Sequence, residues 1–350
     1  MGKSLHLCFS ARHSLFTQRG GDTVQIEATA AALEKRGHSV TIVGPKDTIP
    51  STATHLHVFN IGRPADHLAH FAAFNGPKVL SSIYVDYLLA DTQRHPTLSK
   101  LLGSHGMEWL KTLLRGLNRT DAFPPAGYLL SGQRKSMEKL LEQVECVVAS
   151  SQSELHRLEG SVKTALPNSV VLPLGIQSDF FTLPANKSTR QGVLMVGRLE
   201  TLKNQLCVAQ YCADHGIPLT VVGDPNVNQP DYYKAIAALG VNMLPHQDTE
   251  ALINLMDTHS VLAIPSLLET FALVGVEAAA RGMHVLANNV ADMNETLAHV
   301  ANFTNFELPQ EFGPALTHAL AQGQKKSQPD LSDHNWDTIA EKLETIYLKP

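Results

Sequence analysis

The sequence predicts a doubly wound α/β protein, and three observations support this fold class. Short apolar runs alternate with helix-forming stretches along the first half of the chain, and the same rhythm returns after residue 192. Residues 260–282 show one such unit in compact form: an apolar run, a polar loop, and then a helix-forming stretch that ends at a glycine. With 350 residues the chain exceeds what one hydrophobic core usually holds, so two domains of about 170 residues are expected.

The first half is expected to hold a parallel sheet, because helices separate its predicted strands. Asp22 is expected to cap the first helix, and Gly37 to end it. Strands are predicted at residues 5–9, 39–43, 56–60, 78–83 and 146–149, and helices at residues 23–36, 65–74, 98–115, 131–142 and 152–159.

The second half repeats the alternation after a polar segment, residues 182–191, that contains Pro184 and lacks periodicity, as linkers do. Lys203 is expected to begin a helix. Strands are predicted at residues 192–196, 218–222, 241–244, 261–264 and 283–287, and helices at 231–239, 248–256, from Ala272 onward, and 333–348. The predicted organisation is therefore a first domain over residues 1–181, a linker over 182–191, a second domain over 192–332 and a final helix within 333–350.

Composition excludes several classes of protein. A hydrophobic content of 43% with 17% charged residues indicates a soluble globular chain, and the net charge of −5 argues against nucleic-acid binding. The four cysteines form no C-x2-C pair, and no run of eighteen apolar residues occurs, so we expect buried thiols and a cytoplasmic protein. The seventeen histidines show no metal-ligand spacing, and we expect neither a metal nor another cofactor.

Two glutamates in residues 260–282 suggest a long ligand. Glu269 and Glu277 are eight positions apart, roughly 12 Å if both lie on one helix, which is too far for both carboxylates to act on one atom. A nucleotide sugar fits this spacing, with ribose hydroxyls at Glu277, the transferred sugar at Glu269, and the diphosphate between them. Four backbone N–H groups at the expected start of the helix would hold the phosphates: those of Phe271, Ala272, Leu273 and Val274. The alternative is an ordinary amphipathic helix with two solvated glutamates.

The same segment, with the pattern PS-x2-E-x-F-x-L-x3-E-A-x-A-x-G, resembles the carboxyl-terminal signature of GT-B glycosyltransferases, specifically the retaining family 4. Ala272 stands where that family most often has glycine, and its methyl group narrows the space beside the phosphates. The resemblance implies two Rossmann-like domains facing a cleft, with a final helix that crosses back to the first domain. It also implies transfer of a sugar, with retention and without a metal, from a nucleoside-diphosphate sugar to a hydroxyl acceptor in polysaccharide, lipopolysaccharide or glycolipid assembly.

Two further segments resemble the same family. RGGDTVQIEATAAALEKRGHSVTIVGP resembles its opening, where a loop like that of Gly20 and Gly21 faces the cleft; the alternative is a simple glycine turn. In GRLETLKN, Arg198 and Lys203 match the basic pair that the family aims at the donor diphosphate, and Gly223 resembles a glycine beside the nucleotide. A diphosphate would also offset the unfavourable placement of a lysine at a helix start, and fixed cations can stabilise the leaving phosphate. The alternative is ordinary surface charge.

The catalytic position of the first domain departs from the family pattern. The family commonly has histidine at the end of its fourth strand, in a segment such as I-H-D-Y, whereas residues 81–91 read SSIYVDYLLAD. Asp86 is expected at the carboxyl edge of the sheet, and from there its carboxylate could orient the acceptor hydroxyl or accept the proton of that hydroxyl. Asp91, His13 and His105 are the alternatives, with Asp86 then capping a loop.

Residues 100–139 set seven basic side chains against three acidic ones, among leucines and a tryptophan. This segment could lie on an anionic membrane, at the inner face, that carries a lipid-linked acceptor; the alternative is a packed helical insertion with a solvated basic face. The expected partners are thus a nucleotide-sugar donor and a glycan or lipid-linked acceptor. A nucleotide-sugar 2-epimerase and a non-catalytic nucleotide-sugar binding module remain as rival functions.

Overall fold

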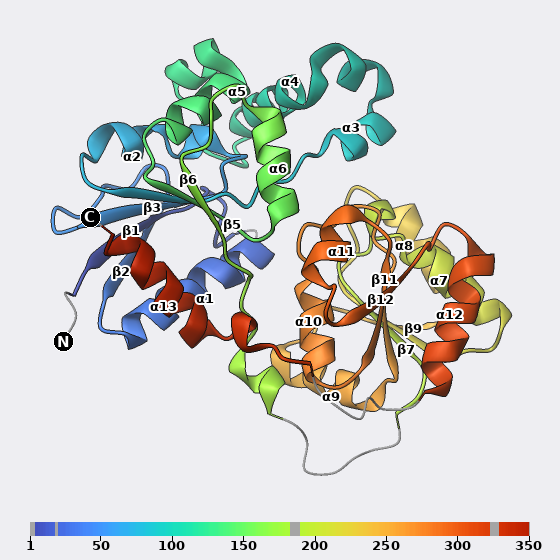
Figure 1. The fold of residues 1–350 in the computed structure, drawn as a ribbon. Helices are drawn as coiled ribbons and strands as arrows, with labels where there is room; N and C mark the ends of the chain where they lie inside the picture. The colour runs from blue at the N-terminus through green and yellow to red at the C-terminus, as the bar shows by residue number, and fades with distance from the viewer. Residues whose placement is uncertain (1–3, 18–19, 183–189, 323–328, 350) are drawn as a thin grey trace. The chain divides into compact units, whose positions relative to one another are not determined.

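The structure, a computed structural model, describes residues 4–17, 20–182, 190–322 and 329–349. Its contacts divide the chain into two compact units, Met1–Gly175 with Trp336–Pro350, and Ile176–Asn335. Each unit holds one parallel six-stranded sheet with flanking helices, so the predicted α/β fold class is confirmed (Figure 1). Most of the predicted linker, residues 183–189, lies outside the described residues.

The sheet of the first unit has the strand order β2-β1-β3-β4-β5-β6, and every neighbouring pair is parallel. Its strands are β1 His6–Ser10, β2 Ser39–Val43, β3 His55–Phe59, β4 Lys78–Ser81, β5 Cys146–Ala149 and β6 Asn168–Val171. The order changes direction between β1 and β3, and the loops after these two strands meet at the carboxyl edge. Doubly wound sheets bind their ligands at such a point.

Helices cover both faces of this sheet. They are α1 Gly21–Lys35, α2 Leu68–Ala73, α3 Leu88–Arg94, α4 Pro96–Leu117, α5 Ala126–Leu141, α6 Gln152–Ser161 and α13 Trp336–Tyr347. On β1, Leu7 and Phe9 pack with α1 and α13 in one core, whereas Cys8 packs with α5 and α6 in the other, because alternate residues of a strand face opposite sides. Helix α3 was not predicted from the sequence.

The prediction that Asp22 caps the first helix is wrong. The helix begins one residue earlier, and Gly20 is its N-cap, with the Gly20 N–H donating to the Thr23 hydroxyl at 3.2 Å. The Asp22 carboxylate accepts from Arg12 Nε at 2.6 Å, and it also accepts from the Thr23 N–H of the first turn at 2.9 Å. A side chain with a guanidinium partner gains more from that ion pair than from a capping bond.

The final helix, α13, packs on the first unit against α1, as the GT-B fold class requires. Near its end the Tyr347 hydroxyl contacts His57 Nδ1 at 2.5 Å, and the Tyr347 carbonyl contacts His55 Nε2 at 2.9 Å. At its start the Trp336 ring lies against Gly175, where a Cβ atom would come within 2.5 Å of it. Burial lowers the pKa of His57 to about 3, so this imidazole is neutral inside the core.

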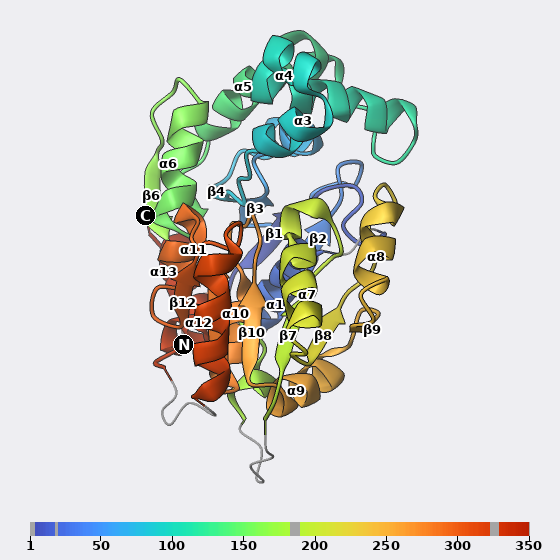
Figure 2. The same ribbon diagram turned by 90° about the vertical axis from the view of Figure 1, so that its right-hand side faces the viewer.

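The sheet of the second unit has the order β12-β11-β10-β7-β8-β9 and is also parallel throughout. Its strands are β7 Val193–Val196, β8 Leu219–Val222, β9 Asn242–Leu244, β10 Val261–Ile264, β11 His284–Asn288 and β12 Ala301–Thr304. The helices of this unit are α7 Gln205–Asp214, α8 Pro230–Ala237, α9 Thr249–Thr258, α10 Leu273–Ala280, α11 Ala291–Thr296 and α12 Pro309–Ala321. Helices α7 and α12 pack side by side, and Figure 2 shows both against the sheet. The sequence predicted a helix start at Lys203, two residues before α7 begins, but it did not predict α11, α12 or β12.

None of the helices in the described part of the chain is long and apolar enough to cross a membrane. The same residues contain no group of three or more His, Cys, Asp or Glu side chains that could hold a metal ion. All four cysteines are unpaired thiols, two of them buried.

Candidate active site

The second unit brings Lys203 and Glu269 together as an ion pair at the carboxyl edge of its sheet. Lys203 lies in the loop after β7 and Glu269 in the loop after β10, and these two strands are neighbours in the sheet. The two loops are also joined by their backbones, since the Leu267 N–H donates to the Leu202 carbonyl at 2.8 Å. The pair joins two residues, 66 positions apart, that the sequence assigned to adjacent parts of one ligand, the diphosphate and the transferred sugar.

Lys203 does not begin a helix, contrary to the prediction. It ends a 3-10 turn, Thr201–Lys203, and Asn204 follows in the left-handed conformation with φ 52°. Helix α7 therefore starts at Gln205. The argument that a helix dipole opposes this lysine consequently does not apply, and the ion pair with Glu269 compensates its charge instead.

Glu277 projects from α10, and its carboxylate has no hydrogen-bond or ionic partner among the described residues. Burial raises the pKa of Glu277 to about 7, because the surroundings disfavour the charged form. A half-buried carboxylate that lacks partners is well suited to accept hydrogen bonds from a ligand. Glu269 stands in the loop before α10, so the separation of roughly 12 Å inferred from helical rise does not describe this pair.

The start of α10 offers fewer free N–H groups than the sequence suggested. Ala272 is its N-cap, and the Leu273 N–H already donates to the Phe271 carbonyl at 2.8 Å. The N–H groups of Phe271, Ala272 and Val274 have no protein acceptor among the described residues. Three of the four predicted donors thus remain available at the positive end of the helix dipole.

Two glycines lie against each other where β7 and β8 end. Gly223 has φ 145°, and a Cβ atom there would stand 2.1 Å from the Gly197 carbonyl oxygen, so no other residue fits. The sequence indicated Gly223 but not Gly197, although a glycine directly after the first strand of a Rossmann-like unit was a readable signal. Arg198 follows, with an exposed guanidinium that has no ionic partner in the described part of the chain.

In the first unit, the loop after β4, where the sequence placed the family's catalytic motif, holds a residue with a strained backbone. Ile83 has φ 39°, which is rare for a β-branched side chain. Glu154, buried at the start of α6, holds this loop. Its carboxylate accepts from the Ser82 hydroxyl and from the Tyr84 N–H at 2.8 Å, on either side of Ile83. It also accepts from the Ser150 N–H at 2.9 Å. Sequence reasoning missed Glu154, because its partners near β4 are some 70 residues away.

Asp86 lies in this same loop. Its Oδ1 accepts from the Leu88 N–H at 2.9 Å and from the Ser104 hydroxyl at 2.6 Å. Asp91 is buried and pairs with Lys111 at 2.8 Å. His105 Nε2 contacts the Ser161 carbonyl at 2.6 Å. Asp86 thus keeps one carboxylate oxygen without a protein partner, whereas Asp91 and His105 are engaged.

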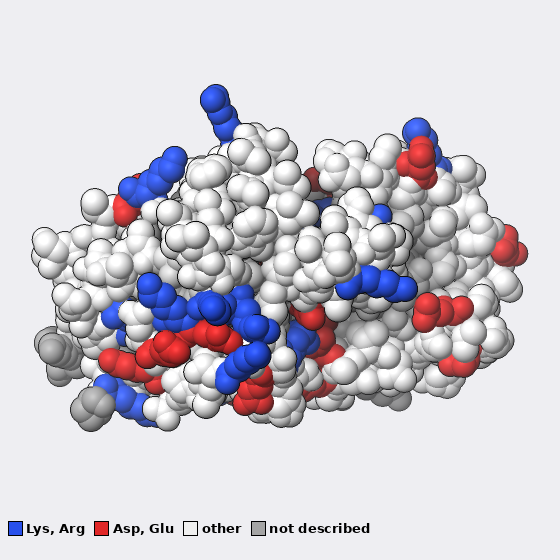
Figure 3. Space-filling view, turned by 90° about the horizontal axis from the view of Figure 1, so that it is seen from above, with Lys and Arg blue, Asp and Glu red and all other residues white. Residues whose placement is uncertain are grey.

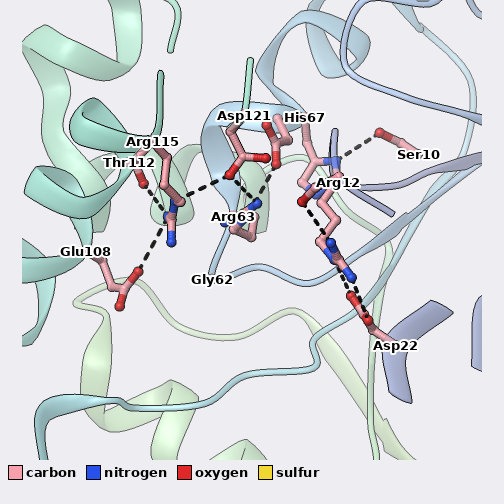
Figure 4. A network of polar contacts seen from close by, with 12 residues as sticks. Ser10, Arg12, Asp22, Gly62, Arg63, His67, Glu108, Thr112, Arg115 and Asp121 are labelled. Atoms are coloured by element: carbon pink, nitrogen blue, oxygen red, sulfur yellow. Dashed lines mark hydrogen bonds and ion pairs between the residues drawn. The ribbon is translucent and has the colours of Figure 1, made fainter. Parts of the chain in front are cut away.

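A network of ion pairs stands where the order of the first sheet changes direction (Figure 4). Arg12, from the loop after β1, pairs with Asp22, and Arg63, from the loop after β3, pairs with Asp121 at 2.7 Å. Arg115 of α4 lies 3.4 Å from the same Asp121 carboxylate. This network ties the α3–α5 segment to the ligand-binding edge of the sheet.

The glycine pair of the first unit lies beside this network. Gly20 is half-buried as the N-cap of α1, and a Cβ atom there would stand 3.1 Å from an Asp22 carboxylate oxygen. A Cβ atom on Gly21 would meet no atom within 4 Å, so only Gly20 is constrained by its neighbours.

A cavity of about 340 Å³ opens between the loops after β1 and β2. Arg12, His13, Phe16 and Lys46 are among the residues that line it. His13 and Lys46 have no polar partner among the described residues, and Phe16 is 58% exposed. This basic pocket with an aromatic wall places His13, one of the sequence candidates, at a site that could receive a ligand.

Comparisons with known proteins agree with this architecture. Residues 176–329 match the family model described as glycosyl transferases group 1. The D-inositol 3-phosphate glycosyltransferase of Corynebacterium urealyticum is 22% identical over 94% of this chain and 90% of its own length, and that of Mycobacteroides abscessus is 23% identical over 94% and 84%.

Among solved structures, the sucrose-phosphate synthase of Thermosynechococcus elongatus superposes with a TM-score of 0.73 at 14% identity, covering 98% of both chains. WaaG, a glycosyltransferase involved in lipopolysaccharide biosynthesis, superposes with a TM-score of 0.62 at 16% identity, covering 98% of this chain and 100% of its own. From the matching second unit, the related sequences and the shared fold together, we conclude that the chain is a GT-B glycosyltransferase similar to those of family 4.

Proposed function

We propose that this glycosyltransferase moves a sugar from a nucleoside diphosphate to a hydroxyl acceptor with retention of the anomeric configuration. One observation carries the proposal: the Lys203–Glu269 pair lies in the same unit as the partnerless carboxylate of Glu277. A nucleotide sugar supplies a group for each of these side chains. Its ribose hydroxyls donate to Glu277, its diphosphate accepts from Lys203 and Arg198, and its sugar hydroxyls donate to Glu269.

Donor binding then works by exchange of partners. The diphosphate replaces Glu269 as the ionic partner of Lys203, and the Glu269 carboxylate can then accept hydrogen bonds from the hydroxyls of the sugar. When the bond between the anomeric carbon and the β-phosphate oxygen breaks, negative charge grows on that oxygen, and the fixed cations stabilise it. We propose that the reaction needs no metal, so transfer should persist in EDTA; loss of turnover in EDTA with recovery in magnesium would refute this step.

We assign the acceptor to the first unit. Asp86 Oδ2 has no protein partner in the described residues and can accept the proton of the attacking hydroxyl, as the new bond forms on the face from which the phosphate leaves. The basic cavity beside His13 suits an acceptor that carries an anionic group. The acceptor in the names of the related enzymes is D-inositol 3-phosphate, and this makes inositol with and without phosphate a first pair to test.

The variant Asp86→Asn tests the acceptor side, because it keeps the shape of the side chain but removes its charge. It should lose transfer by about 10² to 10⁴ while donor affinity stays unchanged. His13→Ala is the comparison, since His13 is the remaining candidate for the missing imidazole. Near-normal turnover in Asp86→Asn with a large loss in His13→Ala would reassign the role.

The reaction itself is tested by incubation with a panel of nucleotide sugars without acceptor. Two similar solved structures are complexes with UDP and with UDP-2-fluoro-glucose, so uridine donors stand first in that panel. Slow release of nucleoside diphosphate and free sugar supports the transferase, whereas an epimerised donor would identify a 2-epimerase. With an acceptor, NMR of the anomeric carbon in the product decides between retention and inversion.

We further propose a role in the assembly of a polysaccharide or glycolipid, with peripheral contact at the inner membrane face through residues 100–139. The support is the charge of this segment, in which seven basic residues stand against three acidic ones. Radiolabelled sugar transferred into a lipid extract would agree with a lipid-linked acceptor, and transfer restricted to water-soluble acceptors would contradict it.

A further inference from the structure

A second cavity of the first unit, about 480 Å³ in volume, lies between the loop after β2 and helix α2. We call it the Phe74 cavity, and we call the basic cavity described above the His13 cavity. Pro45, Lys46 and Asp47 line both of them, so the two cavities are neighbours that share a wall. Each is large enough for a small-molecule ligand. The assignments made so far give the Phe74 cavity no role.

The lining of the Phe74 cavity mixes apolar and polar side chains. The apolar ones come from the loop after β2 and from α2 with its C-cap: Ile49, Pro50, Ala69, Ala73 and Phe74. The polar ones are exposed and supply one cation, one carboxylate and two hydroxyls: Lys46, Asp47, Thr48 and Ser51. A sugar ring has the same mixed character, because its C–H groups are apolar and its hydroxyls both donate and accept hydrogen bonds.

Most of these polar groups have no protein partner in the part of the chain that the structure describes. Lys46 has no ionic partner there, and the hydroxyls of Thr48 and Ser51 have no hydrogen-bond partner. Asp47 engages only Oδ2, which accepts from the Gly44 N–H at 2.8 Å. Many charged side chains on the face in Figure 3 stand next to charges of opposite sign, unlike Lys46. The cavity thus offers a ligand one cationic donor, one free carboxylate oxygen and two hydroxyls.

The wall between the two cavities is held in place. The Asp47 carbonyl accepts from His70 Nε2 at 2.9 Å, so the other ring nitrogen, Nδ1, accepts from the Ser10 hydroxyl at 2.7 Å. His70 is buried, and the Asp47 N–H donates to the Gly44 carbonyl at 3.0 Å. A wall that is already fixed loses little conformational freedom when a ligand binds.

The two cavities differ in charge. In the Phe74 cavity the charges of Lys46 and Asp47 balance, so this cavity suits an uncharged group. The His13 cavity adds Arg12 and His13 to the same two residues, so it suits an anionic group.

We propose that the two cavities together hold an acceptor of at least two linked sugar units, an anionic unit in the His13 cavity and an uncharged unit in the Phe74 cavity. The inference rests on the proposed function, which places the acceptor in the first unit. It names the acceptor as an acidic disaccharide or oligosaccharide. An acyl chain fits the Phe74 cavity less well, because it would displace water from four polar side chains and offer them no hydrogen bond.

Titration of the full-length protein without donor, followed by NMR of the ligand, tests the proposal. The probes are glucose, glucuronic acid and three disaccharides in which glucose, galactose or mannose is linked to glucuronic acid. At least one disaccharide should bind about tenfold more tightly than glucuronic acid, because two or more further hydrogen bonds form in the Phe74 cavity. The proposal is overturned if none of the three binds more tightly than glucuronic acid, or if octanoate displaces the disaccharide and glucose does not.

Ala73→Trp fills the Phe74 cavity, so it should remove the gain of the disaccharide and leave the affinity for glucuronic acid unchanged. Ala72→Trp is the matched control, because Ala72 is an exposed alanine of the same helix that is not among the residues lining either cavity. The control should keep the full gain, and thermal melting should show both variants folded.

The double variant Thr48→Val, Ser51→Ala gives a second measurement that needs no large side chain. It removes two hydroxyls that have no partner among the described residues, so disaccharide binding should weaken by about tenfold while glucuronic acid binds as before. Unchanged disaccharide affinity in this variant would overturn the proposal. Disaccharide binding without transfer from any nucleotide sugar would contradict only the proposed function, and transfer to single sugars without preference for the disaccharide would contradict only this inference.

Discussion

The carboxyl edges of the two sheets are built on opposite plans. In the first unit several polar groups are paired with one another: Glu154 accepts several hydrogen bonds around a strained Ile83, and arginines pair with Asp22 and Asp121. In the second unit Glu277 has no polar partner among the residues that the structure describes, and Arg198 is exposed without an ionic partner among them. A network in which every polar group has a hydrogen-bond partner keeps its geometry fixed, whereas polar groups without partners can bind a ligand. Under the proposed function, the first edge would serve as a positioning frame and the second as a receptor for the donor.

Among the tests of this comparison, the largest effect should come from the Lys203–Glu269 ion pair of the receptor edge. If Lys203 exchanges Glu269 for the diphosphate, Lys203→Ala should lower turnover by about 10² to 10³, the usual scale for one electrostatic stabiliser. Lys234→Ala is the control, since Lys234 is an exposed lysine of the same unit that pairs only with the exposed Asp231. A loss below tenfold, or an equal loss in the control, would remove Lys203 from the chemistry.

On the positioning edge, the expected effect is on both geometry and stability. Glu154→Ala leaves the Tyr84 and Ser150 N–H groups without acceptors and leaves the Ser82 hydroxyl with only the Val148 carbonyl, which should cost about 3 kcal/mol in the free energy of unfolding. Transfer should fall about tenfold with donor affinity unchanged, because the loop with Asp86 loses its support. The exposed Glu159→Ala on the same helix is the control in urea unfolding and in kinetics. A selective loss of donor binding in Glu154→Ala would contradict the assignment of donor binding to the second unit alone.

The charged form of Glu277 at the receptor edge should also lower the stability of the folded protein. The pKa of Glu277 is raised from 4.5 to about 7, so between these values the folded state keeps a proton that the unfolded state has lost. Stability should therefore fall as pH rises through this window, by at most about 3 kcal/mol. Glu277→Gln removes this loss, and its unfolding free energy should gain on the wild type between pH 5 and pH 7.5. If the unfolding free energies of the two proteins changed in parallel with pH, the inference that the Glu277 carboxylate is buried without a partner would be wrong.

The same contrast explains what sequence could predict. Apolar runs located the strands, and residues 260–282 located Glu269 and Glu277, because such signals are local. Glu154 was missed because its role depends on Ser82 and Tyr84, which the fold brings near. Helix α12 was missed because it contains Pro314, which usually argues against a helix interior. Lys203 was assigned to a helix start although Asn204, a residue type enriched in the left-handed conformation, could have signalled the turn there.

Calorimetry with UDP, GDP and ADP is the most direct test of the claim that Glu277 of the receptor edge binds the nucleotide and Glu154 of the positioning frame does not. The nucleotide that binds most tightly is then titrated into Glu277→Ala, Glu154→Ala and the exposed control Glu250→Ala. Losing a charged acceptor that holds ribose hydroxyls should cost roughly 1.5 to 3 kcal/mol, so Glu277→Ala should bind about ten- to a hundredfold more weakly. The other two variants should bind like the wild type. Unchanged affinity in Glu277→Ala would contradict the account.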